Sequence, residues 1–479
     1  MSIYRNFFFN LLLIFSQLIF PILVLPYVNR VLGPSNIGVF NLVDNFAQYF
    51  ITIAALGIPI YGVREISKSR MVSKSSLNKT FCELITINIV LTAFCIIIYI
   101  LFLLFSPTVQ KNFIFYFIGL IQVISGVFSL EWYFQGIENF KFIAIRTFII
   151  RIISVIIIYL LVKSKSDTVL YYLITTFAFF VTAILNIYYL SKNIKYNFPS
   201  LSSLKKHIKP LFTFFTTKFM ISIYVTLTTI LLGFLSTEKD VGYFSLSFKV
   251  FNIVVVIVSS LATVMISRSS VVADSNKEAF DNLIQKAYYF NIFISLPLLA
   301  IVSLYAKEII LLLGGIDFLP MVDSLRFLSV LIFIIPLSNL FALNILTPLK
   351  KEHFFLRATM IGTIISLILN FSLIPEYGYK GATYAFLTTE TVVWVLLFYY
   401  AYQSHRFNLN LSFVIKSFIT CLMFVPVYYF LPNVQPYVKL LLGTIASVLI
   451  YSIVHIFIIK NNIVLMYLEL IWKRILPAK

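Results

Sequence analysis

A few charged side chains fall inside long apolar stretches of the sequence, where the cost of burying a charge implies that it has a partner or a task. The basic members are Arg151, Lys218, Lys249, Arg326 and Lys416, and the acidic members are Asp44, Glu83, Glu131 and Glu390. Lys and Arg bind phosphate well, because Lys carries a compact charge and Arg a two-pronged fork of donors. A carboxylate in the same setting relays a proton, binds Na⁺ or neutralises a nearby Lys.

The depth of each basic residue within its stretch separates binding candidates from surface residues. Lys218, Lys249 and Arg151 lie well inside their apolar stretches. We predict that these three line a water-filled cavity and bind an anion, with a structural ion pair as the alternative for the two lysines. Arg326 and Lys416 lie near the ends of their stretches, from where a long side chain reaches the headgroups. Arg326 is kept as a fourth candidate for the anion-binding cavity.

Two acids, Asp44 and Glu390, are deep enough to be candidates for binding H⁺ or Na⁺. Glu83 and Glu131 lie near the predicted inner ends, where water could solvate them. The three cysteines lie in apolar stretches without a C-x-x-C spacing, and the four histidines are far apart in the sequence. The sequence therefore predicts neither a metal site nor any other cofactor.

Composition identifies the setting of these residues. Hydrophobic residues make up 60% of the 479 residues and charged residues only 11%. Soluble domains are about 45–50% apolar and about 25% charged. A soluble chain of this size could not bury so much apolar surface, which excludes a cytosolic enzyme, a nucleic-acid-binding module and a disordered chain. The composition indicates an all-α polytopic membrane protein.

A helix needs roughly 20 mostly apolar residues to cross a bilayer, and about fourteen segments meet this requirement. They lie near 7–29, 37–61, 81–105, 113–135, 145–162, 170–190, 211–235, 241–267, 287–306, 324–348, 355–374, 381–402, 412–430 and 437–459. If the N-terminus is inside, the inner segments carry about three times as many Lys and Arg as the outer ones. This ratio accounts for much of the net charge of +19 and predicts that both termini are cytoplasmic.

The chain also contains an internal repeat. At an offset of 204 residues, the pattern Gly38-x-Phe40-x-Leu42 recurs at residues 242–246, and Arg64 matches Arg268. A similar offset relates residues 142–154 to 353–366. We interpret Gly38 as a site of close helix packing and Arg64 as an anchor at the inner surface.

The repeat divides the chain into two six-helix lobes with the same orientation, residues 1–200 and 201–403. Residues 404–479 add two further spans and a C-terminal segment, near 463–476, that is predicted to lie on the inner leaflet. Proteins with two such lobes usually bind their substrate in the crevice between them. Because Asp44 and Lys249 occupy almost equivalent positions in the repeats, we predict that they face each other across this crevice.

Several runs of sequence carry a resemblance to a known family. They are PYVNRVLGPSNIGVFN, GIPIYGVREISKSR, WYFQGIENFKFIAIR, YAKEIILLLGG, DSLRFLS and NFSLIPEYGYKGATYA. Together and in this order they resemble bacterial Wzx-type flippases, which carry the repeat units of polysaccharides such as O-antigen and capsule. This family belongs to the multidrug/oligosaccharidyl-lipid/polysaccharide exporter superfamily and has a MATE-like architecture.

The resemblance implies a carrier of the bacterial cytoplasmic membrane without enzymatic activity. Such a carrier moves an undecaprenyl-pyrophosphate-linked oligosaccharide to the outer leaflet by alternating access. The glycan headgroup passes through a cationic central cavity while the polyprenyl tail stays in lipid. Membrane lipids and the lipid-linked glycan are the expected partners, with a polysaccharide polymerase and chain-length machinery as further ones.

Three other functions stay open at this point. A multidrug exporter of the same superfamily has the same architecture, although cationic drugs favour acidic cavities over a basic one. A lipid II flippase differs only in its cargo. A glycan polymerase or ligase characteristically has a large outer loop with catalytic groups, whereas the predicted outer loops are short.

Overall fold

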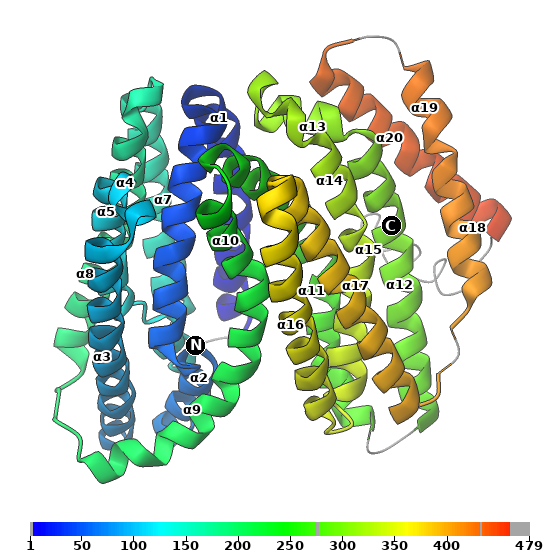
Figure 1. The fold of residues 1–479 in the computed structure, drawn as a ribbon. Helices are drawn as coiled ribbons and strands as arrows, with labels where there is room; N and C mark the ends of the chain where they lie inside the picture. Colours follow the sequence, from blue (N-terminus) through cyan, green and yellow to red (C-terminus); the bar gives the residue numbers. More distant parts are fainter. Residues whose placement is uncertain (1–2, 274–276, 408, 432–433, 460–479) are drawn as a thin grey trace. The chain divides into compact units, whose positions relative to one another are not determined.

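A computed structural model describes residues 3–273, 277–407, 409–431 and 434–459 (Figure 1). Every regular element in these ranges is a helix, so the predicted all-α fold is confirmed. Helices satisfy their backbone hydrogen bonds internally, which lipid requires because it offers no water to satisfy them. The segment near 463–476, predicted to lie on the inner leaflet, falls outside the described residues.

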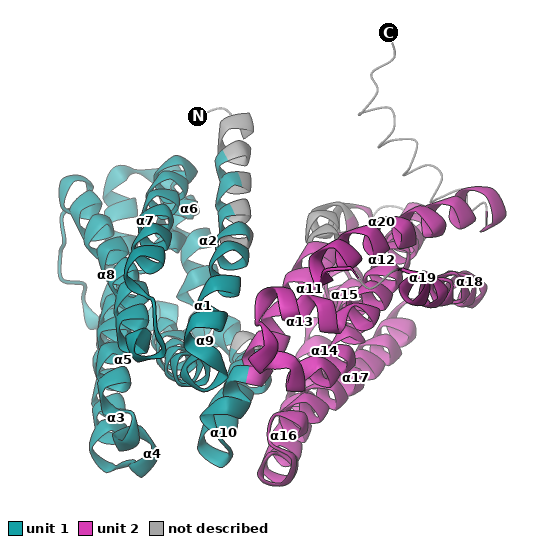
Figure 2. Cartoon of the chain, turned by 90° about the horizontal axis from the view of Figure 1, so that it is seen from above, with its two compact units in different colours: residues 1–242 teal, residues 243–479 magenta. Residues whose placement is uncertain are grey.

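The chain folds into two compact units, residues 1–242 and 243–479 (Figure 2). The first unit contains α1 (Ile3–Ala55), α2 (Ile58–Val72), α3 (Lys74–Phe105), α4 (Pro107–Lys111), α5 (Phe113–Gly126), α6 (Glu131–Gly136), α7 (Phe140–Leu161), α8 (Thr168–Asn193), α9 (Leu201–Ser222) and α10 (Thr228–Leu235). A 3₁₀ turn (Lys165–Asp167) precedes α8, and a π-helical turn (Ile223–Leu227) joins α9 to α10.

Most of α11 (Glu238–Ala273) belongs to the second unit, although its first turn lies in the first. The second unit continues with α12 (Lys277–Leu304), α13 (Ala306–Leu313), α14 (Val322–Ser329), α15 (Leu331–Asn339), α16 (Glu352–Tyr377), α17 (Tyr379–Ser404), α18 (Leu411–Leu422), α19 (Phe424–Phe430) and α20 (Pro436–Val454). Shorter turns are the 3₁₀ segment Ile316–Met321 and the π-helical segments Leu340–Leu346 and His455–Ile459. The lobe boundaries predicted at residues 200 and 403 rest on the repeat and stay predictions.

Eleven helices in the described ranges are long and apolar enough to cross a membrane, or thirteen when each of two bent helix pairs is counted as one span. The bent pairs are Ile19–Ala55 with Ile58–Val72 and Leu201–Thr216 with Phe219–Leu235. About fourteen spans were predicted; the first of these lies within α1, and the second begins in α1 and ends in the first turn of α2. The polytopic architecture is therefore confirmed, and the difference in count arises largely in α1.

α1 is a hairpin of two arms rather than one straight rod. Its backbone leaves the helical conformation at Gly33, where φ is 76° and ψ is 171°, and glycine reaches a positive φ without steric cost. The contacts are Ser16 with Arg151 and Tyr27 with Val162 in the first arm, and Asn36 with Lys165 and Phe40 with Tyr171 in the second. The first arm thus runs along α7 and the second returns along α8.

Segments predicted to lie on the same side of the membrane meet at the same end of their unit. At the predicted inner end, the contacts are Asn78 with Lys195 and Arg70 with Glu138 in the first unit, and Asp281 with His405 in the second. At the predicted outer end they are Lys111 with Glu238, and Tyr379 with Pro320. These contacts support the predicted alternation of spans. Which end is cytoplasmic rests on the charge count.

The two copies of the glycine motif meet at a close helix crossing in the first unit. A Cβ atom built on Gly38 would lie 1.6 Å from the carbonyl oxygen of Glu238, and one built on Gly242 would lie 2.0 Å from that of Pro34. An offset of 204 residues exchanges these two contacts, which is the reciprocity that a twofold axis produces. The crossing supports the internal repeat and the predicted role of Gly38 in close packing.

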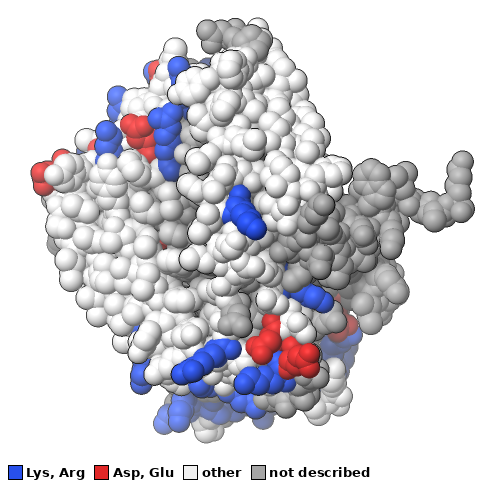
Figure 3. All heavy atoms as spheres, turned by 90° about the vertical axis from the view of Figure 1, so that its right-hand side faces the viewer, with Lys and Arg blue, Asp and Glu red and all other residues white. Residues whose placement is uncertain are grey.

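Charged side chains are concentrated away from the broad apolar surface. Figure 3 shows one face on which Lys, Arg, Asp and Glu gather toward the upper and lower edges, with few between them. Large apolar side chains such as Phe94, Ile97 and Phe177 are exposed on the helices of the first unit. A surface of this kind is stable against lipid chains and would be costly in water.

Candidate functional site

Arg151 lies near the middle of α7, partly buried, and reaches the first arm of α1. Its Nη1 donates a hydrogen bond to Ser16 Oγ at 3.3 Å, and this hydroxyl donates to the carbonyl oxygen of Leu13 at 2.7 Å. Arg151 has no carboxylate partner among the residues that the structure describes. Since a guanidinium carries five N–H donors, most of its capacity is available to water or to an anion.

Asp44 belongs to a chain of polar groups that joins three helices of the first unit. Gln122 of α5 donates through Nε2 to Asp44 Oδ1 at 3.0 Å, and the hydroxyl of Tyr172 in α8 donates to Gln122 Oε1 at 3.2 Å. Gln122 and Tyr172 are buried, while Asp44 is only partly buried. The Asp44 carboxylate is therefore held by the buried Gln122, while the residue stays partly accessible from outside the unit.

In the second unit, the helices that carry Lys249 and Glu390 pack together close to both residues. Phe248 and Phe251, which lie on either side of Lys249 in α11, contact Phe386 of α17 with ring centroids 5.4 and 6.0 Å apart. Glu390 follows Phe386 by about one helical turn and is only 7% exposed. Within the described ranges it has no hydrogen-bond or ion-pair partner. A partly buried lysine and a buried carboxylate thus lie on two helices that pack together, and sequence analysis did not predict this packing.

The remaining predicted site residues are placed as follows. Lys218 is in α9, and its side chain is outside the described part of the structure. Arg326 is an exposed residue of α14 whose Nη1 lies 3.3 Å from Asp323 Oδ1, an arrangement that fits the surface alternative considered for it. The predicted approach of Asp44 to Lys249 joins the two units and stays a prediction.

Sequence analysis missed a buried ionic cluster at the predicted inner end of the first unit. Glu83 of α3 lies near a predicted inner end, where water could solvate it, yet its side chain is fully buried. Its Oε2 lies 2.8 Å from Lys206 Nζ and 2.9 Å from His207 Nε2, and His207 Nδ1 lies 2.7 Å from the hydroxyl of Tyr61. This cluster ties α2 and α3 to the start of α9, and the Glu83 carboxylate is held through Oε2 by Lys206 and His207. The available signal was the Lys206-His207 pair in the loop just before the seventh predicted span.

A second missed cluster involves Arg146, which lies five residues before Arg151 in α7. Its side chain is buried, its Nη2 lies 2.8 Å from Glu131 Oε1, and it also donates to Asn186 of α8. Asn186 in turn donates to the carbonyl oxygen of Phe128. Arg146 therefore has a structural role, and its partner Glu131 is not free for chemistry.

The described residues contain no group of three His, Cys, Asp or Glu side chains that could hold a metal ion. Cys82, Cys95 and Cys421 are buried and unpaired with one another. The arrangement is thus one of charged and polar side chains on membrane-spanning helices, suited to binding.

Comparison with known sequences identifies the family. A family model described as "Polysaccharide biosynthesis protein" matches residues 3–270, more than half of the chain. The chain belongs to this polysaccharide biosynthesis family. The MatE family model also matches residues 214–372. The predicted resemblance to Wzx-type members of the multidrug/oligosaccharidyl-lipid/polysaccharide exporter superfamily is thereby confirmed.

Individual relatives agree with this assignment to the polysaccharide biosynthesis family. The chain is 25% identical over 408 residues to a protein of Escherichia coli K12 named "Putative O-antigen transporter", covering 83% of this chain and 96% of the relative. A protein of the same name from Shigella dysenteriae is 24% identical, with coverages of 80% and 97%.

Two solved structures share the fold. The lipid II flippase MurJ in an inward closed conformation has a TM-score of 0.66 at 16% identity, over 88% of this chain and 96% of that one. An inward-facing multidrug resistance transporter of the MATE family has a TM-score of 0.60 at 14% identity, over 80% and 97%. The MATE-like fold predicted for this member of the polysaccharide biosynthesis family is confirmed.

Proposed function

We propose that this protein moves undecaprenyl-pyrophosphate-linked oligosaccharide repeat units from the inner to the outer leaflet of the bacterial cytoplasmic membrane. The observation that carries the proposal is Arg151, a guanidinium near the middle of a membrane-spanning helix whose described hydrogen bond goes to a neutral hydroxyl. Such a charge is costly in lipid and typical of a substrate pathway. A diphosphate supplies the negative charge, and Arg binds phosphate oxygens through parallel hydrogen bonds.

The names of similar proteins support a glycan-bearing lipid as the cargo. The Escherichia coli relative is named for O-antigen transport, and one structural neighbour is a lipid II flippase. For this chain we infer the same class of cargo, with the headgroup passing through the protein and the polyprenyl tail remaining in lipid. No covalent bond of the cargo changes, so the proposed activity is that of a carrier and not of an enzyme.

The proposed route is a cationic cavity between two lobes that opens alternately to each side. Lys218, Lys249 and Arg151 would bind the diphosphate, and Arg326 would act nearer the surface. The internal repeat supports this route because two similar lobes can rock about a common axis.

Ion coupling is the proposed source of energy. Glu390 is buried without a partner in the described ranges, so it would take up H⁺ or be neutralised by Na⁺. Asp44, fixed by Gln122, is the second candidate. In this proposal both termini are cytoplasmic, and a polymerase with its chain-length machinery receives the cargo outside.

The sidedness of the cargo tests this function. Intact spheroplasts of a strain without this protein would be treated with a membrane-impermeant sugar oxidant, and the labelled lipid-linked repeat units counted. We expect units that accumulate and become labelled only after the membrane is opened. Full labelling in intact spheroplasts would mean that the cargo still reaches the outer leaflet and would refute the proposal.

Multidrug export is the second candidate, favoured by the match to the MatE model over residues 214–372. The basic residues within the spans oppose it, because a cationic drug requires carboxylates. Drug susceptibility of the same strain separates the two: a lower tolerance of cationic drugs with normal cargo sidedness would favour drug export.

A further inference from the structure

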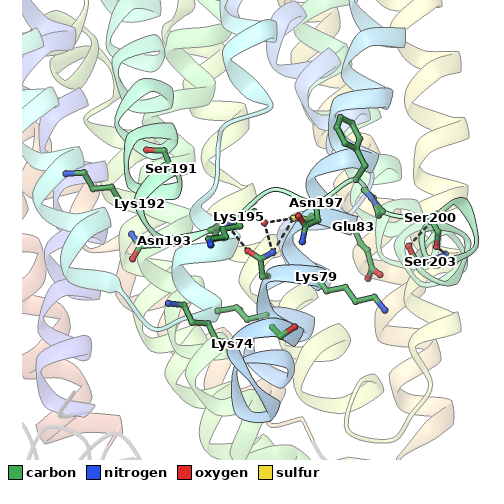
Figure 4. A pocket seen from close by; sticks show the side chains of 17 residues that line it. Lys74, Lys79, Glu83, Ser191, Lys192, Asn193, Lys195, Asn197, Ser200 and Ser203 are labelled. Atoms are coloured by element: carbon green, nitrogen blue, oxygen red, sulfur yellow. Dashed lines mark hydrogen bonds between the residues drawn. The ribbon is translucent and has the colours of Figure 1, made fainter.

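The first unit has a cavity of about 730 Å³ at its predicted inner end, and its lining includes none of the residues proposed to bind the cargo (Figure 4). The start of α3, the end of α8, the segment 194–200 and the start of α9 form its walls. Its lining is rich in polar groups and includes Lys74, Lys79, Lys192 and Lys195. Arg151 and Asp44 do not line it.

Specific hydrogen bonds build this cavity by pinning the segment 194–200 to α3. Asn78 Nδ2 donates to the carbonyl oxygen of Lys195 at 2.6 Å, and the Lys195 amide donates back to Asn78 Oδ1 at 3.0 Å. Farther along α3, the hydroxyl of Thr86 lies 2.7 Å from the hydroxyl of Tyr196 in the same segment. This wall of the cavity is therefore an extended segment that hydrogen bonds fix to α3.

The cavity is strongly basic, and its lysines are not neutralised by carboxylates. Within the described part of the chain none of the four lysines forms an ion pair, whereas Arg64, Arg70 and Lys206 at the same end each do. The carboxylate of Glu83 also lines the cavity, but it is buried and compensated by Lys206 and His207. The N-terminus of α3, which begins at Lys74, adds a partial positive charge.

The lysines surround the cavity instead of converging on one atom. In Figure 4, Lys74 and Lys192 extend to one side of the cavity and Lys79 to the other. Lys192 is also held against the ring of Tyr188. This spacing suits a broad anionic group with several oxygens, such as a substituted phosphate, better than a small ion.

Exposed apolar side chains flank the same walls. Met71 and Val72 precede the start of α3, and Phe198 and Leu201 lie in and just after the pinned segment. Each of the four is more than three quarters exposed. Apolar and aromatic side chains beside lysines are typical of the membrane interface, where the apolar groups enter the lipid and the amino groups meet the headgroups. They indicate that the anion belongs to a lipid and is not dissolved in the cytoplasm.

We propose that this cavity binds the phosphate headgroup of an acidic glycerophospholipid from the leaflet that borders it. The headgroup lies among Lys74, Lys79 and Lys195, and the acyl chains leave past Phe198 into the bilayer. The bound lipid connects α3 with the segment that joins α8 to α9, and it is separate from the cargo proposed above.

Lipid binding to the purified full-length protein tests this site without any transport measurement. Native mass spectrometry in detergent would compare phosphatidylglycerol with neutral phosphatidylcholine. We expect a clear preference for phosphatidylglycerol and an affinity about tenfold or more lower in the triple variant K74Q/K79Q/K195Q. The matched control K141Q/K205Q/K209Q removes the same charge from exposed lysines of the same end and should keep the preference.

A second variant tests the built wall without changing charge. Asn78→Ala releases both hydrogen bonds to Lys195, and it should lower the affinity while the lysines stay in place. Equal losses in the two triple variants would overturn the site, because general positive charge would then suffice. Binding of inorganic pyrophosphate but not of phosphatidylglycerol, or tighter lysine-dependent binding of undecaprenyl phosphate, would also overturn it in favour of a soluble phosphate or the cargo.

Discussion

Replacing Gly38 with alanine would force a methyl group into the backbone of α11. The added Cβ would lie 1.6 Å from the carbonyl oxygen of Glu238, whereas an ordinary contact needs at least 3.4 Å. The obstacle is backbone and not the flexible end of a side chain, so the helices must move apart. Overpacking of this kind costs about 1–3 kcal/mol, and 1.4 kcal/mol is a tenfold change in an equilibrium. We therefore expect this crossing to open about fivefold to a hundredfold more often.

The crossing lies in the first unit and joins residues of the two predicted repeats at the predicted outer end, so in the proposed carrier we expect its opening to favour the outward-open conformation. A cysteine introduced at Ile37, which is 4% exposed beside the crossing, reports this change. We expect faster labelling by a membrane-impermeant maleimide in Gly38→Ala and a lower rate of export. Gly242→Ala should act similarly, because its Cβ meets the carbonyl oxygen of Pro34.

Gly126→Ala is the matched control in the same unit. The nearest atom to its Cβ would be a side-chain carbon of Ile51, at 2.9 Å, and not backbone, so any strain arises away from the crossing of Gly38 with Glu238. We expect normal labelling of the Ile37 cysteine in this variant. If Gly38→Ala labels at the parent rate and exports normally, the close crossing does not control opening, and the reasoning is refuted.

Three further predictions concern charged residues within the spans. Lys249→Ala and Lys218→Ala should each reduce export without changing the amount of protein in the membrane. Lys249→Arg should reduce export less than Lys249→Ala. Normal export in both alanine variants would contradict the cationic route. Glu390→Gln should leave binding of the lipid-linked cargo intact but make its translocation in proteoliposomes independent of the H⁺ or Na⁺ gradient. If translocation by the variant responds to the gradient as it does in the parent protein, ion coupling lies elsewhere. Arg151→Gln should reduce export at near-normal thermal stability, whereas Arg146→Gln should lower the melting temperature, because the buried guanidinium holds both Glu131 and Asn186. A melting temperature unchanged in the Arg146 variant would contradict its structural role.

The helical fold was predictable because lipid restricts a chain to few solutions. An apolar stretch of about 20 residues has to be a helix, so hydropathy alone located most spans. The offset between Gly38 and Gly242 also predicted a repeat, and the reciprocal contact at the crossing agrees with it. α1 shows the limit of this reasoning. Hydropathy predicts two spans there, but the backbone leaves the helical conformation only at Gly33, so the two spans form one continuous helical element and the two counts differ.

The partners of charged residues could not be predicted, because they are distant in the chain. Glu83 meets His207 across 124 residues and Asn78 meets Lys195 across 117. No local pattern encodes such contacts, so neither the burial of Glu83 nor the lysine-lined cavity was predicted. The charge count did place these lysines together on the predicted inner side of the membrane. It could not show that the segment 194–200, fixed to α3, encloses a cavity between them.

Depth within a span is therefore a weaker guide to function than the presence of a partner in the same unit. Arg146 and Arg151 lie in one helix, and the deeper burial belongs to Arg146, whose charge Glu131 already balances. Arg151 is less buried and has a hydroxyl where a carboxylate would be needed. Balanced charges hold helices together, while an unbalanced charge in lipid destabilises the chain until a ligand compensates it. By the same criterion the exposed pair of Arg326 with Asp323 is a weak candidate for the cargo, and Arg151 a strong one.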